Sequence, residues 1–315
     1  MGSSAKDRMD QQVQVANLYY KENMSQQEIA NELKISRTTV SRILKSCIEE
    51  GIVSIHIKNS SMYQYDMEKK IEEKYGLKHV CVISNNEDHD LFFKTMGRSL
   101  ADFLKENITK NVKIGISAGN AIESVSDYLY PVENYAIDVY QLMGDASHQT
   151  SSCSSYLTIR MARKLGGTAH AMHVPMVVNS KVLHDLLLDE PYNKNHFQEL
   201  NQLDMAIVGL GHMDSLLPNA TDMWNNYEEE KTELRMRGVV GNICGVFLNQ
   251  DGNICDAEVQ ERIIAIPLDR LRSVPNCIAV AFGRYKKYIT KAAIKGGYVN
   301  VLMIDEELAL ALLED

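Results

Sequence analysis

The apolar residues among the first fifty positions recur with a helical period in three stretches separated by short polar breaks. The first stretch, residues 11–22, places Val15 and Leu18 on one face. The second begins at Ser25 and the third at Ser36, and only two residues lie between the end of the second stretch and Ser36. Two short helices joined this closely predict a helix-turn-helix.

The entrances of the second and third helices carry specific signals. Ser25 and Glu28 have the spacing of a capping box, in which each side chain satisfies the other residue's backbone amide. Met24 and Ile29 flank that box as a hydrophobic staple. The turn before the third helix has Lys34 at a position where helix-turn-helix proteins often have glycine.

The third helix divides into an apolar stripe and an opposite stripe of hydroxyl and basic side chains. Arginine can read guanine in the major groove, while hydroxyls and lysine can hold phosphates. An ordinary surface helix with solvated charges is the alternative. The alternating residues 53–57 predict a strand, a reduced wing that makes the head winged-helix-like. The candidate DNA-contacting residues are Arg37, Thr38, Thr39, Ser41, Arg42 and Lys45.

Beyond a polar break near residues 58–61, short β-rich runs alternate with helical runs. The predicted strands are residues 79–84, 112–117, 137–143, 205–209, 277–281 and 301–304. The predicted helices between them are residues 91–107, 121–129, 154–165, 181–188 and 286–295. This alternation predicts a doubly wound, mostly parallel α/β sheet with helices on both faces. The fold class is therefore α/β, with a head at residues 1–58 and an effector domain at residues 59–315.

Several predicted strands lead into glycine-containing loops, where ligands of parallel sheets bind. Residues 114–120 can expose backbone amides to an anion. Residues 142–145 and 208–211 end two further strands, and Lys286 follows another at the start of a helix. Together they favour a phosphorylated ligand, although each loop alone is more often a tight turn.

Composition excludes several classes of protein. Of the 315 residues, 45% are hydrophobic and 24% are charged, which is typical of a globular protein and not of a disordered or fibrous one. No apolar run reaches the ~18 residues of a membrane span, and no signal-peptide core is visible. The six cysteines show no CxxC pair, which favours reduced thiols in the cytoplasm.

The formal charge of −9 is unevenly distributed. Residues 1–58 carry 8 basic and 7 acidic side chains, and the remainder carries 25 and 35. Four basic and no acidic residues lie between positions 34 and 45. A local basic stretch on the head is thus compatible with DNA despite the acidic body.

Signals for catalysis or cofactors are weak. His170 and His173 lie in a predicted strand over residues 168–174 and are interpreted as partly buried structural histidines. Asp204 is interpreted as a strand-entry residue, and residues 228–233 as a solvated face or flexible loop. The helix at residues 63–75 is either a packing helix, which we favour, or a dimer contact. We therefore predict no catalytic residue, no metal site and no cofactor.

The chain resembles the SorC family of sugar-responsive bacterial transcription regulators. The resemblance extends from about Gln11 to the C-terminus and is most specific over residues 24–51, 203–211, 238–245 and 278–305. It implies a helix-turn-helix joined to a domain similar to phosphosugar isomerases. In that family, the loop at residues 117–120 and the lysine at position 286 belong to the effector site.

The resemblance implies an effector site with some altered residue types. Ser117 and Asn120 replace the usual types of the first loop, Asp145 stands where a second glycine is usual, and Asn242 stands where Asp is usual. The predicted effector-binding residues are Ser117, Ala118, Gly119, Asn120, Gly144, Asp145, Gly209, Gly211, Asn242 and Lys286.

These observations predict a DNA-binding transcriptional regulator of a carbohydrate-metabolism operon, controlled by a phosphorylated sugar or related metabolite. The alternatives are a phosphosugar isomerase or deaminase-like enzyme, and a small-molecule binding module without a DNA role. The expected partners are double-stranded operator DNA, the phosphorylated sugar and further copies of the chain, as a dimer or tetramer. No membrane partner is expected, and the expected location is the cytoplasm.

Overall fold

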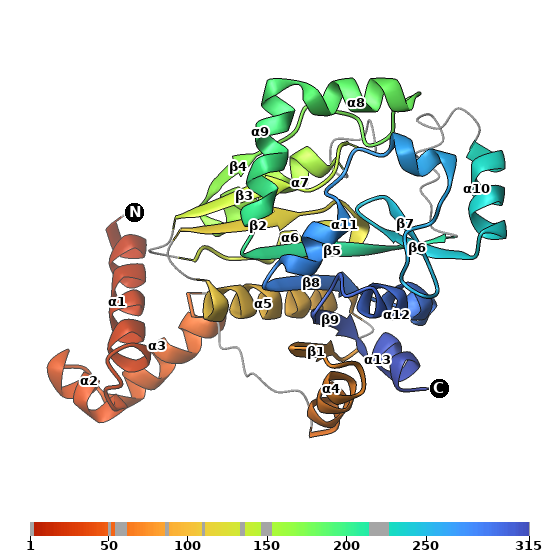
Figure 1. Ribbon diagram of the computed structural model, residues 1–315. Coiled ribbons are helices and arrows are strands. Elements are labelled where there is room, and N and C mark those ends of the chain that lie inside the picture. Colours follow the sequence, from red (N-terminus) through yellow and green to blue (C-terminus); the bar gives the residue numbers. More distant parts are fainter. Residues whose placement is uncertain are drawn as a thin grey trace. The chain divides into compact units, whose positions relative to one another are not determined.

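The computed structural model describes residues 3–49, 52–53, 62–85, 88–108, 111–132, 136–145, 153–213 and 227–314. The chain divides into two compact units, Met1–Asn59 and Ser60–Asp315 (Figure 1). Among the described residues, no helix has both the length and the apolar character needed to cross a membrane.

The first unit contains three helices around a small core. They are α1 (Ser3–Tyr20), α2 (Gln26–Glu32) and α3 (Arg37–Glu49). The core consists of apolar side chains from all three helices: Val15, Leu18, Ile29, Ala30, Val40 and Leu44. The predicted helix-turn-helix is confirmed, and the first helix begins eight residues earlier than its apolar pattern indicates.

The second unit is built on one mixed sheet with the order β1-β9-β8-β5-β2-β3-β4. All neighbours along this path are parallel. The strands are β1 (His79–Ile83), β2 (Val112–Ile116), β3 (Ile137–Gln141), β4 (Thr168–His170), β5 (Met205–His212), β8 (Asn276–Ala281) and β9 (Val301–Asp305). The six predicted strands are therefore present, and the mostly parallel α/β fold is confirmed.

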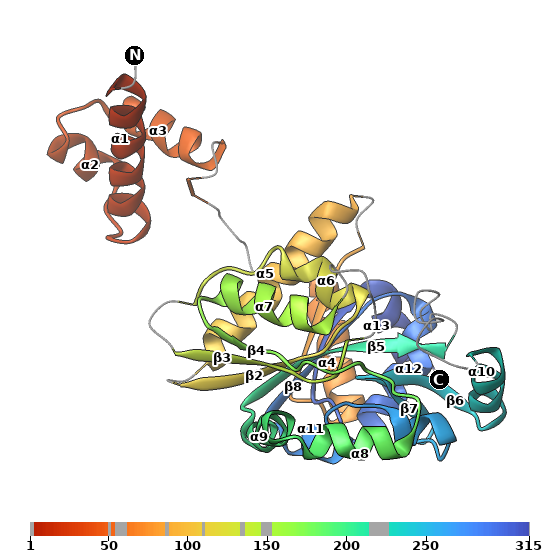
Figure 2. The same cartoon turned by 90° about the horizontal axis from the view of Figure 1, so that it is seen from above.

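Helices cover both faces of this sheet (Figures 1 and 2). One face packs against α5 (His89–Asn107), α6 (Asn120–Ser126) and α7 (Ser154–Leu165). The other face packs against α4 (Met62–Tyr75), α9 (Pro191–Glu199), α11 (Leu268–Ser273), α12 (Lys287–Lys295) and α13 (Glu306–Leu313). Alternate side chains of each strand pack into two separate hydrophobic cores, one on each face of the sheet, so the strands are buried on both faces.

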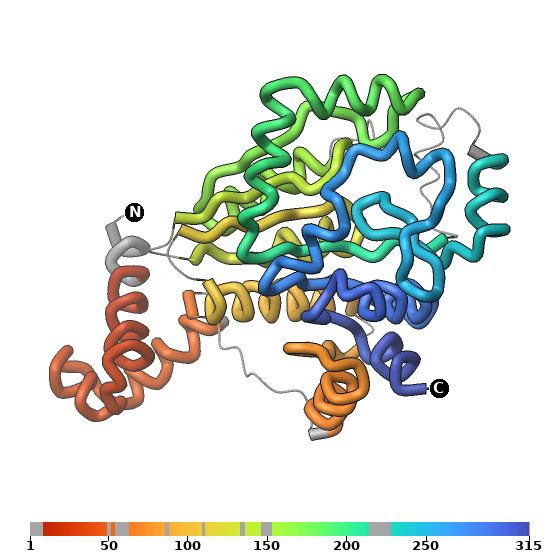
Figure 3. The backbone as a smooth tube through the Cα atoms, viewed as in Figure 1, coloured from red at the N-terminus to blue at the C-terminus, as the bar shows by residue number. Residues whose placement is uncertain are grey.

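Helix α4 opens the second unit and packs beside its last helix, α13 (Figure 3). Met67 and Ile71 of α4 are buried in the core, and the hydroxyl of Tyr75 donates to the carbonyl of Leu312 at 2.7 Å. The preferred interpretation of this helix as a packing helix agrees with these contacts.

An antiparallel hairpin extends β5 at one end. It consists of β6 (Val239–Ile243) and β7 (Val246–Asn249), with Gly211 of β5 opposite Asn242 of β6. Cys244 and Gly245 form its turn with φ values of +53° and +81°. Positive φ at both central residues matches the twist of a tight hairpin.

The remaining elements correct two expectations and distinguish between the two alternatives of a third. Strand β4 ends at His170, so His173 lies outside the strand and is exposed. Residues 228–233, interpreted as a solvated face or flexible loop, lie in a helix, α10 (Tyr227–Met236), on which Glu228, Glu229 and Thr232 are exposed. The solvated face is the alternative that agrees with this helix. Helix α6 ends at Ser126, three residues before the predicted end. Between β4 and β5 lie α8 (Lys181–Asp189), which matches the helix predicted at residues 181–188, and α9, which was not predicted.

Candidate functional site

The second helix of the head begins at the predicted capping box. The amide of Glu28 donates to Ser25 Oγ at 3.3 Å, and the amide of Ser25 donates to the Glu28 carboxylate at 2.8 Å. The bond from the Ser25 amide lowers the pKa of Glu28. Local sequence therefore fixes the start of α2.

The turn between α2 and α3 depends on Lys34. Its φ is +54°, in the left-handed region, and the next amide, that of Ile35, donates back to the carbonyl of Ala30 at 3.0 Å. Lys34 therefore has the conformation that glycine commonly supplies at the end of a helix. Ser36 then caps α3, because its Oγ accepts the amide of Thr39 at 3.0 Å.

Helix α3 presents the predicted polar stripe to solvent. Val40, Leu44 and Cys47 are buried on the opposite side. Among the described residues, no ion pair involves Arg37 or Arg42, so neither guanidinium is neutralised by a neighbouring carboxylate there. The exposed residues are Arg37, Thr38, Thr39, Ser41, Arg42 and Lys45.

A hydroxyl cluster lies at the N-terminus of that stripe. The hydroxyls of Thr38 and Thr39 lie 2.7 and 2.8 Å from Ser36 Oγ. Each remains exposed and keeps acceptor capacity for a phosphate-bound water or a base edge. Most of the predicted wing strand, residues 54–57, lies outside the described residues.

In the second unit, most of the predicted effector residues lie in or just after four neighbouring strands, β8, β5, β2 and β3. Gly209 and Gly211 belong to the last residues of β5, which extends to His212, and Asn242 belongs to the hairpin strand β6. The four neighbouring strands are parallel, so their carboxyl ends share one edge of the sheet (Figure 1). Ligands of open α/β sheets bind at that edge.

Ser117 joins β2 to β5. Its amide donates to the carbonyl of Ile207 at 3.0 Å, and its hydroxyl accepts the amide of Gly209 at 2.9 Å. The side chain is fully buried. Ser117 therefore positions the loop, and Ala118, Gly119 and Asn120 form its accessible part.

Lys286 and Asn242 approach the end of β5 from two different elements. Lys286 lies in the short turn of 3-10 helix Arg284–Lys286, and its Nζ donates to the carbonyl of Leu210. A Cβ at Gly211 would lie 2.4 Å from Asn242 Nδ2, so only glycine allows the amide to sit there. Burial lowers the pKa of Lys286 to about 8.

Gly144 and Asp145 follow β3, one strand further along the sheet. The amide of Gly144 donates to the carbonyl of Ile264 at 2.9 Å, and a Cβ there would lie 2.4 Å from the carbonyl oxygen of Pro175. The carboxylate of Asp145 accepts the amide and the hydroxyl of Ser155 at the start of α7. Asp145 thus supports the first turn of α7 from the loop after β3, while the N-cap residue itself is Cys153.

One candidate beside Lys286 was not predicted. The ring of Tyr285 is half exposed and stands 5.7 Å from Lys286 Nζ. Its edge-to-face contact with His212 of β5 has a centroid distance of 5.6 Å. Residues 283–286, Gly-Arg-Tyr-Lys, include this tyrosine. The direction of its side chain depends on tertiary packing, so the sequence alone does not place it beside Lys286.

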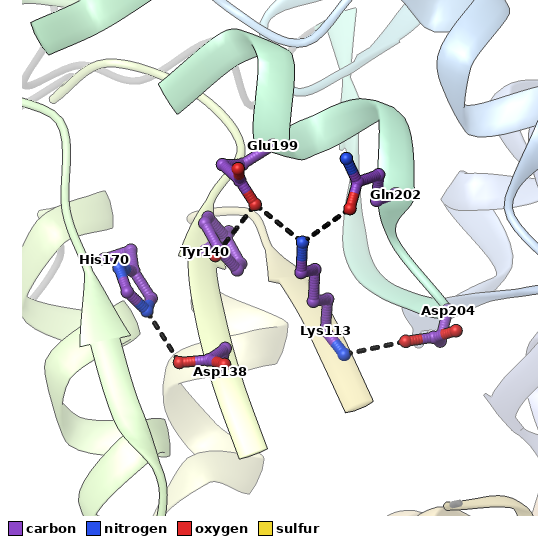
Figure 4. Close-up of polar contacts among 7 residues, drawn as sticks. All are labelled: Lys113, Asp138, Tyr140, His170, Glu199, Gln202 and Asp204. Atoms are coloured by element: carbon purple, nitrogen blue, oxygen red, sulfur yellow. Dashed lines mark hydrogen bonds and ion pairs between the residues drawn. The ribbon is translucent and has the colours of Figure 1, made fainter. Parts of the chain in front are cut away.

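A polar cluster on the α9 side of the sheet involves residues that the sequence drew attention to (Figure 4). His170 Nε2 lies 2.8 Å from Asp138 Oδ1, and its ring stacks on Tyr140 at 4.4 Å. The Asp204 carboxylate accepts the amide of Lys113 at 2.8 Å, as a strand-entry residue can.

The same cluster fastens α9 to the sheet. Lys113 Nζ donates to Glu199 at 2.6 Å and to Gln202 at 2.8 Å. Burial, with the Glu199 charge, raises the pKa of Tyr140 to about 12. Across the described ranges, no three His, Cys, Asp or Glu side chains converge as metal ligands. The cluster therefore has a structural role, in which Lys113 of β2 holds the end of α9 against the sheet.

Family models match both units. The model described as "Putative sugar-binding domain" matches residues 61–314, and a winged helix-turn-helix DNA-binding model matches residues 17–54. The sorbitol operon regulator of Klebsiella pneumoniae is 30% identical over 311 residues, covering 96% of this chain and 97% of that relative. The chain belongs to the SorC family.

Other comparisons agree with SorC-family membership. The crystal structure of full-length SorC from Klebsiella pneumoniae has a TM-score of 0.84 at 28% identity, and covers 97% of this chain and 99% of that one. The deoxyribonucleoside regulator of Bacillus subtilis (strain 168) is 31% identical over 314 residues, covering 98% of this chain and 99% of the relative. The predicted resemblance and two-part architecture are confirmed.

Proposed function

We propose that this SorC-family chain regulates an operon of carbohydrate metabolism, binding operator DNA through α3 and a phosphorylated sugar through its second unit. The observation that carries the DNA role is the exposed cationic stripe on a capped recognition helix. A recognition helix of this kind enters the major groove. The named relatives are a sorbitol operon regulator and a deoxyribonucleoside regulator, which supports a carbohydrate-linked role.

The effector is a phosphorylated sugar or related metabolite held at the carboxyl edge of the sheet. Lys286 supplies the positive charge for the phosphate, and the Ala118–Asn120 backbone supplies donors. Asn242 is half-buried beside Gly211 and can bond a hydroxyl group as donor or acceptor. Gly209 and Gly211 contribute no side chains at their two positions near the end of β5.

The alternative of a phosphosugar isomerase or deaminase-like enzyme has less support. Two described carboxylates contact the Lys286 loop: Glu314 pairs with Arg284, and Asp305 accepts the amide of Gly283. Asp305 also accepts the amide of Leu308. It therefore caps α13 and holds the loop, and is not poised as a base. The named relatives are regulators. We propose a protein that binds its ligand without converting it and needs no cofactor.

Binding to a palindromic operator would require at least two copies, so we propose a homo-oligomer, dimer or tetramer. A protein that binds operator DNA acts where the bacterial chromosome lies, so the proposed location is the cytoplasm.

The decisive experiment measures binding of the purified full chain to its own promoter DNA by fluorescence anisotropy, with and without sugar phosphates. We expect tight, salt-dependent binding that ribose 5-phosphate, glucosamine 6-phosphate or a related compound changes. Native mass spectrometry of co-purified ligand would identify the compound. Sustained turnover of either phosphate, lost in Lys286→Ala, would support the enzyme instead.

A further inference from the structure

Helix α13 shares the groups that cap its two ends with neighbouring elements. At its start, Asp305 is the N-cap and accepts an amide of the first turn at 3.1 Å. At its end, the hydroxyl of Tyr75 donates to the carbonyl of Leu312 at 2.7 Å. Lys74 Nζ donates to the carbonyl of Leu313 at 3.2 Å. Both donors are at the end of α4, so α4 satisfies carbonyls that have no partner within α13.

The cap at the start of α13 also holds the loop that carries Lys286. Both carboxylate oxygens of Asp305 lie 3.0 Å from the amide nitrogen of Gly283. Arg284, in the same loop, pairs with Glu314 after the end of α13. That ion pair is exposed on both sides and contributes little, whereas Asp305 is buried. The buried carboxylate therefore ties α13 to the Lys286 loop.

The partner of Lys286 depends on whether a phosphate is bound. In this structure its Nζ donates to the carbonyl of Leu210, near the end of β5. A phosphate at the proposed site would compete for the same ammonium group, because the attraction between two full charges exceeds that between a charge and a carbonyl dipole. The ammonium group would then be drawn away from Leu210, and its loop would take a second position. A ligand shifts a conformational equilibrium through such a difference in contacts.

Helix α4 is attached to the outer edge of the sheet through two carboxylates. In the edge strand β1, the amide of Val80 donates to Glu72 at 3.0 Å and the amide of Val82 donates to Glu68 at 2.8 Å. The carboxylates are one helical turn apart, and the amides are two residues apart on the strand. Exchange of these amides with solvent requires that their bonds to α4 open, so their exchange rate reports the docking of α4.

We propose that α13 transmits occupation of the effector site to α4, the first helix of the second unit after the head. Phosphate binding moves the Lys286 loop, Asp305 carries that movement into α13, and the two caps from α4 carry it on to α4. Helix α4 then changes its docking on β1, and along the chain α4 is the helix next to α3 of the head. The inference rests on the proposed function, because it concerns the regulation of the proposed effector site.

The first experiment measures hydrogen exchange of β1 by mass spectrometry on the full chain. The probes are ribose 5-phosphate, glucosamine 6-phosphate and inorganic phosphate, and calorimetry first establishes which of them bind. A bound probe should change the exchange rate of the Val80 and Val82 amides by about 5-fold or more, the lower end of typical allosteric coupling. Peptides from α8, which packs against α9, are the internal control and should not change.

A variant of α4 tests the route itself. Tyr75→Phe with Lys74→Met removes both donors to α13 and keeps side chains of similar size. Probe binding should be retained, the exchange response of β1 should fall below about 2-fold, and operator affinity should no longer respond to the probe. The matched control, Tyr63→Phe with Lys70→Met, makes the same chemical changes at exposed positions of α4 and should respond fully. Circular dichroism confirms that each variant is folded.

The outcomes separate this inference from the proposed function. If none of the three probes binds, the proposed effector site is wrong and the inference is wrong with it. If a probe binds but leaves the exchange of β1 unchanged, the effector site stands and the inference is overturned. A wild-type exchange response or operator response in the Tyr75→Phe Lys74→Met variant would overturn it as well.

Discussion

The carboxylate of Asp145 accepts two hydrogen bonds from Ser155, one from the amide at 2.9 Å and one from the hydroxyl at 2.8 Å. A negative charge thus stands at the N-terminus of α7, where the helix dipole favours an anion. A phosphate at the same place would meet that charge. We therefore expect the phosphate to bind nearer Lys286 than Asp145.

Replacing Asp145 by alanine removes the carboxylate that accepts the amide and hydroxyl of Ser155 in the first turn of α7. We expect the free energy of unfolding to fall by ~0.5–2 kcal/mol, measured by urea denaturation. Affinity for a sugar phosphate should stay equal or rise, because a negative charge is lost. Asp145→Asn keeps an acceptor without the charge, so it separates the two effects. A large loss of affinity in both variants would instead make Asp145 a direct ligand of the sugar.

Arg42→Ala should weaken binding to operator DNA by ~1–3 kcal/mol and relax sequence preference, because a base-edge contact is lost. Lys45→Ala should act on all sequences alike and reduce the salt slope by about 1. Anisotropy titrations at several salt concentrations measure both. Lys21→Ala, an exposed lysine outside α3, is the control. Wild-type affinity and salt slope in both α3 variants would exclude this face.

Lys286→Ala should weaken binding of the phosphorylated effector by roughly 10- to 150-fold, because a hydrogen bond to a charged partner is worth ~1.5–3 kcal/mol. Isothermal titration calorimetry with a sugar phosphate and its dephosphorylated analogue measures this. Lys295→Ala, an exposed lysine at the other end of α12, should bind as the wild type does. Equal affinity of wild type for both compounds would argue against a phosphate site.

The pH dependence of effector binding should follow Lys286, whose pKa is lowered to about 8 by burial. The ammonium form binds phosphate, and the free protein loses that proton as pH rises through 8. Affinity should therefore be highest below pH 8 and fall above it, since the phosphate itself stays dianionic well above its second pKa of ~6. Titrations from pH 7 to 9.5 test this, and Lys286→Ala should give a flat profile.

Lys34 should tolerate glycine but not a β-branched residue, because its φ of +54° disfavours side chains that branch at Cβ. Lys34→Gly is expected to keep or raise the melting temperature of the head, and Lys34→Val to lower it. Thermal unfolding monitored by circular dichroism compares them. A lower melting temperature for glycine than for valine would contradict the role of the turn geometry.

Local signals in the sequence were sufficient for the head. The capping box at Ser25 and the cap at Ser36 act within a few residues, so both helix starts were predictable. The left-handed turn was not, because lysine carries no such signal. The hairpin β6–β7 was missed for the same reason, since its turn uses Cys244 and Gly245 in place of an Asn-Gly pair.

The candidate effector site was predictable only as a set of loops. Parallel strands have their carboxyl ends at the same edge of the sheet. This rule alone predicts that the residues near the ends of β8, β5, β2 and β3 lie close together. The buried role of Ser117 and the bond from Lys286 to Leu210 depend on partners 92 and 76 residues away along the chain. Spacing within one segment carries no information about such contacts.

The pairing of β1 with β9 constrains how the protein is made. His79 lies opposite Val301, and the strand between β1 and β8 is supplied by residues near the C-terminus. The ribosome therefore releases the whole head, and then most of the second unit, before the sheet can close. A nonsense codon just upstream of β9 would leave a complete head attached to a sheet in which β1 and β8 have lost the strand between them, and such newly unpaired edges favour aggregation or proteolysis.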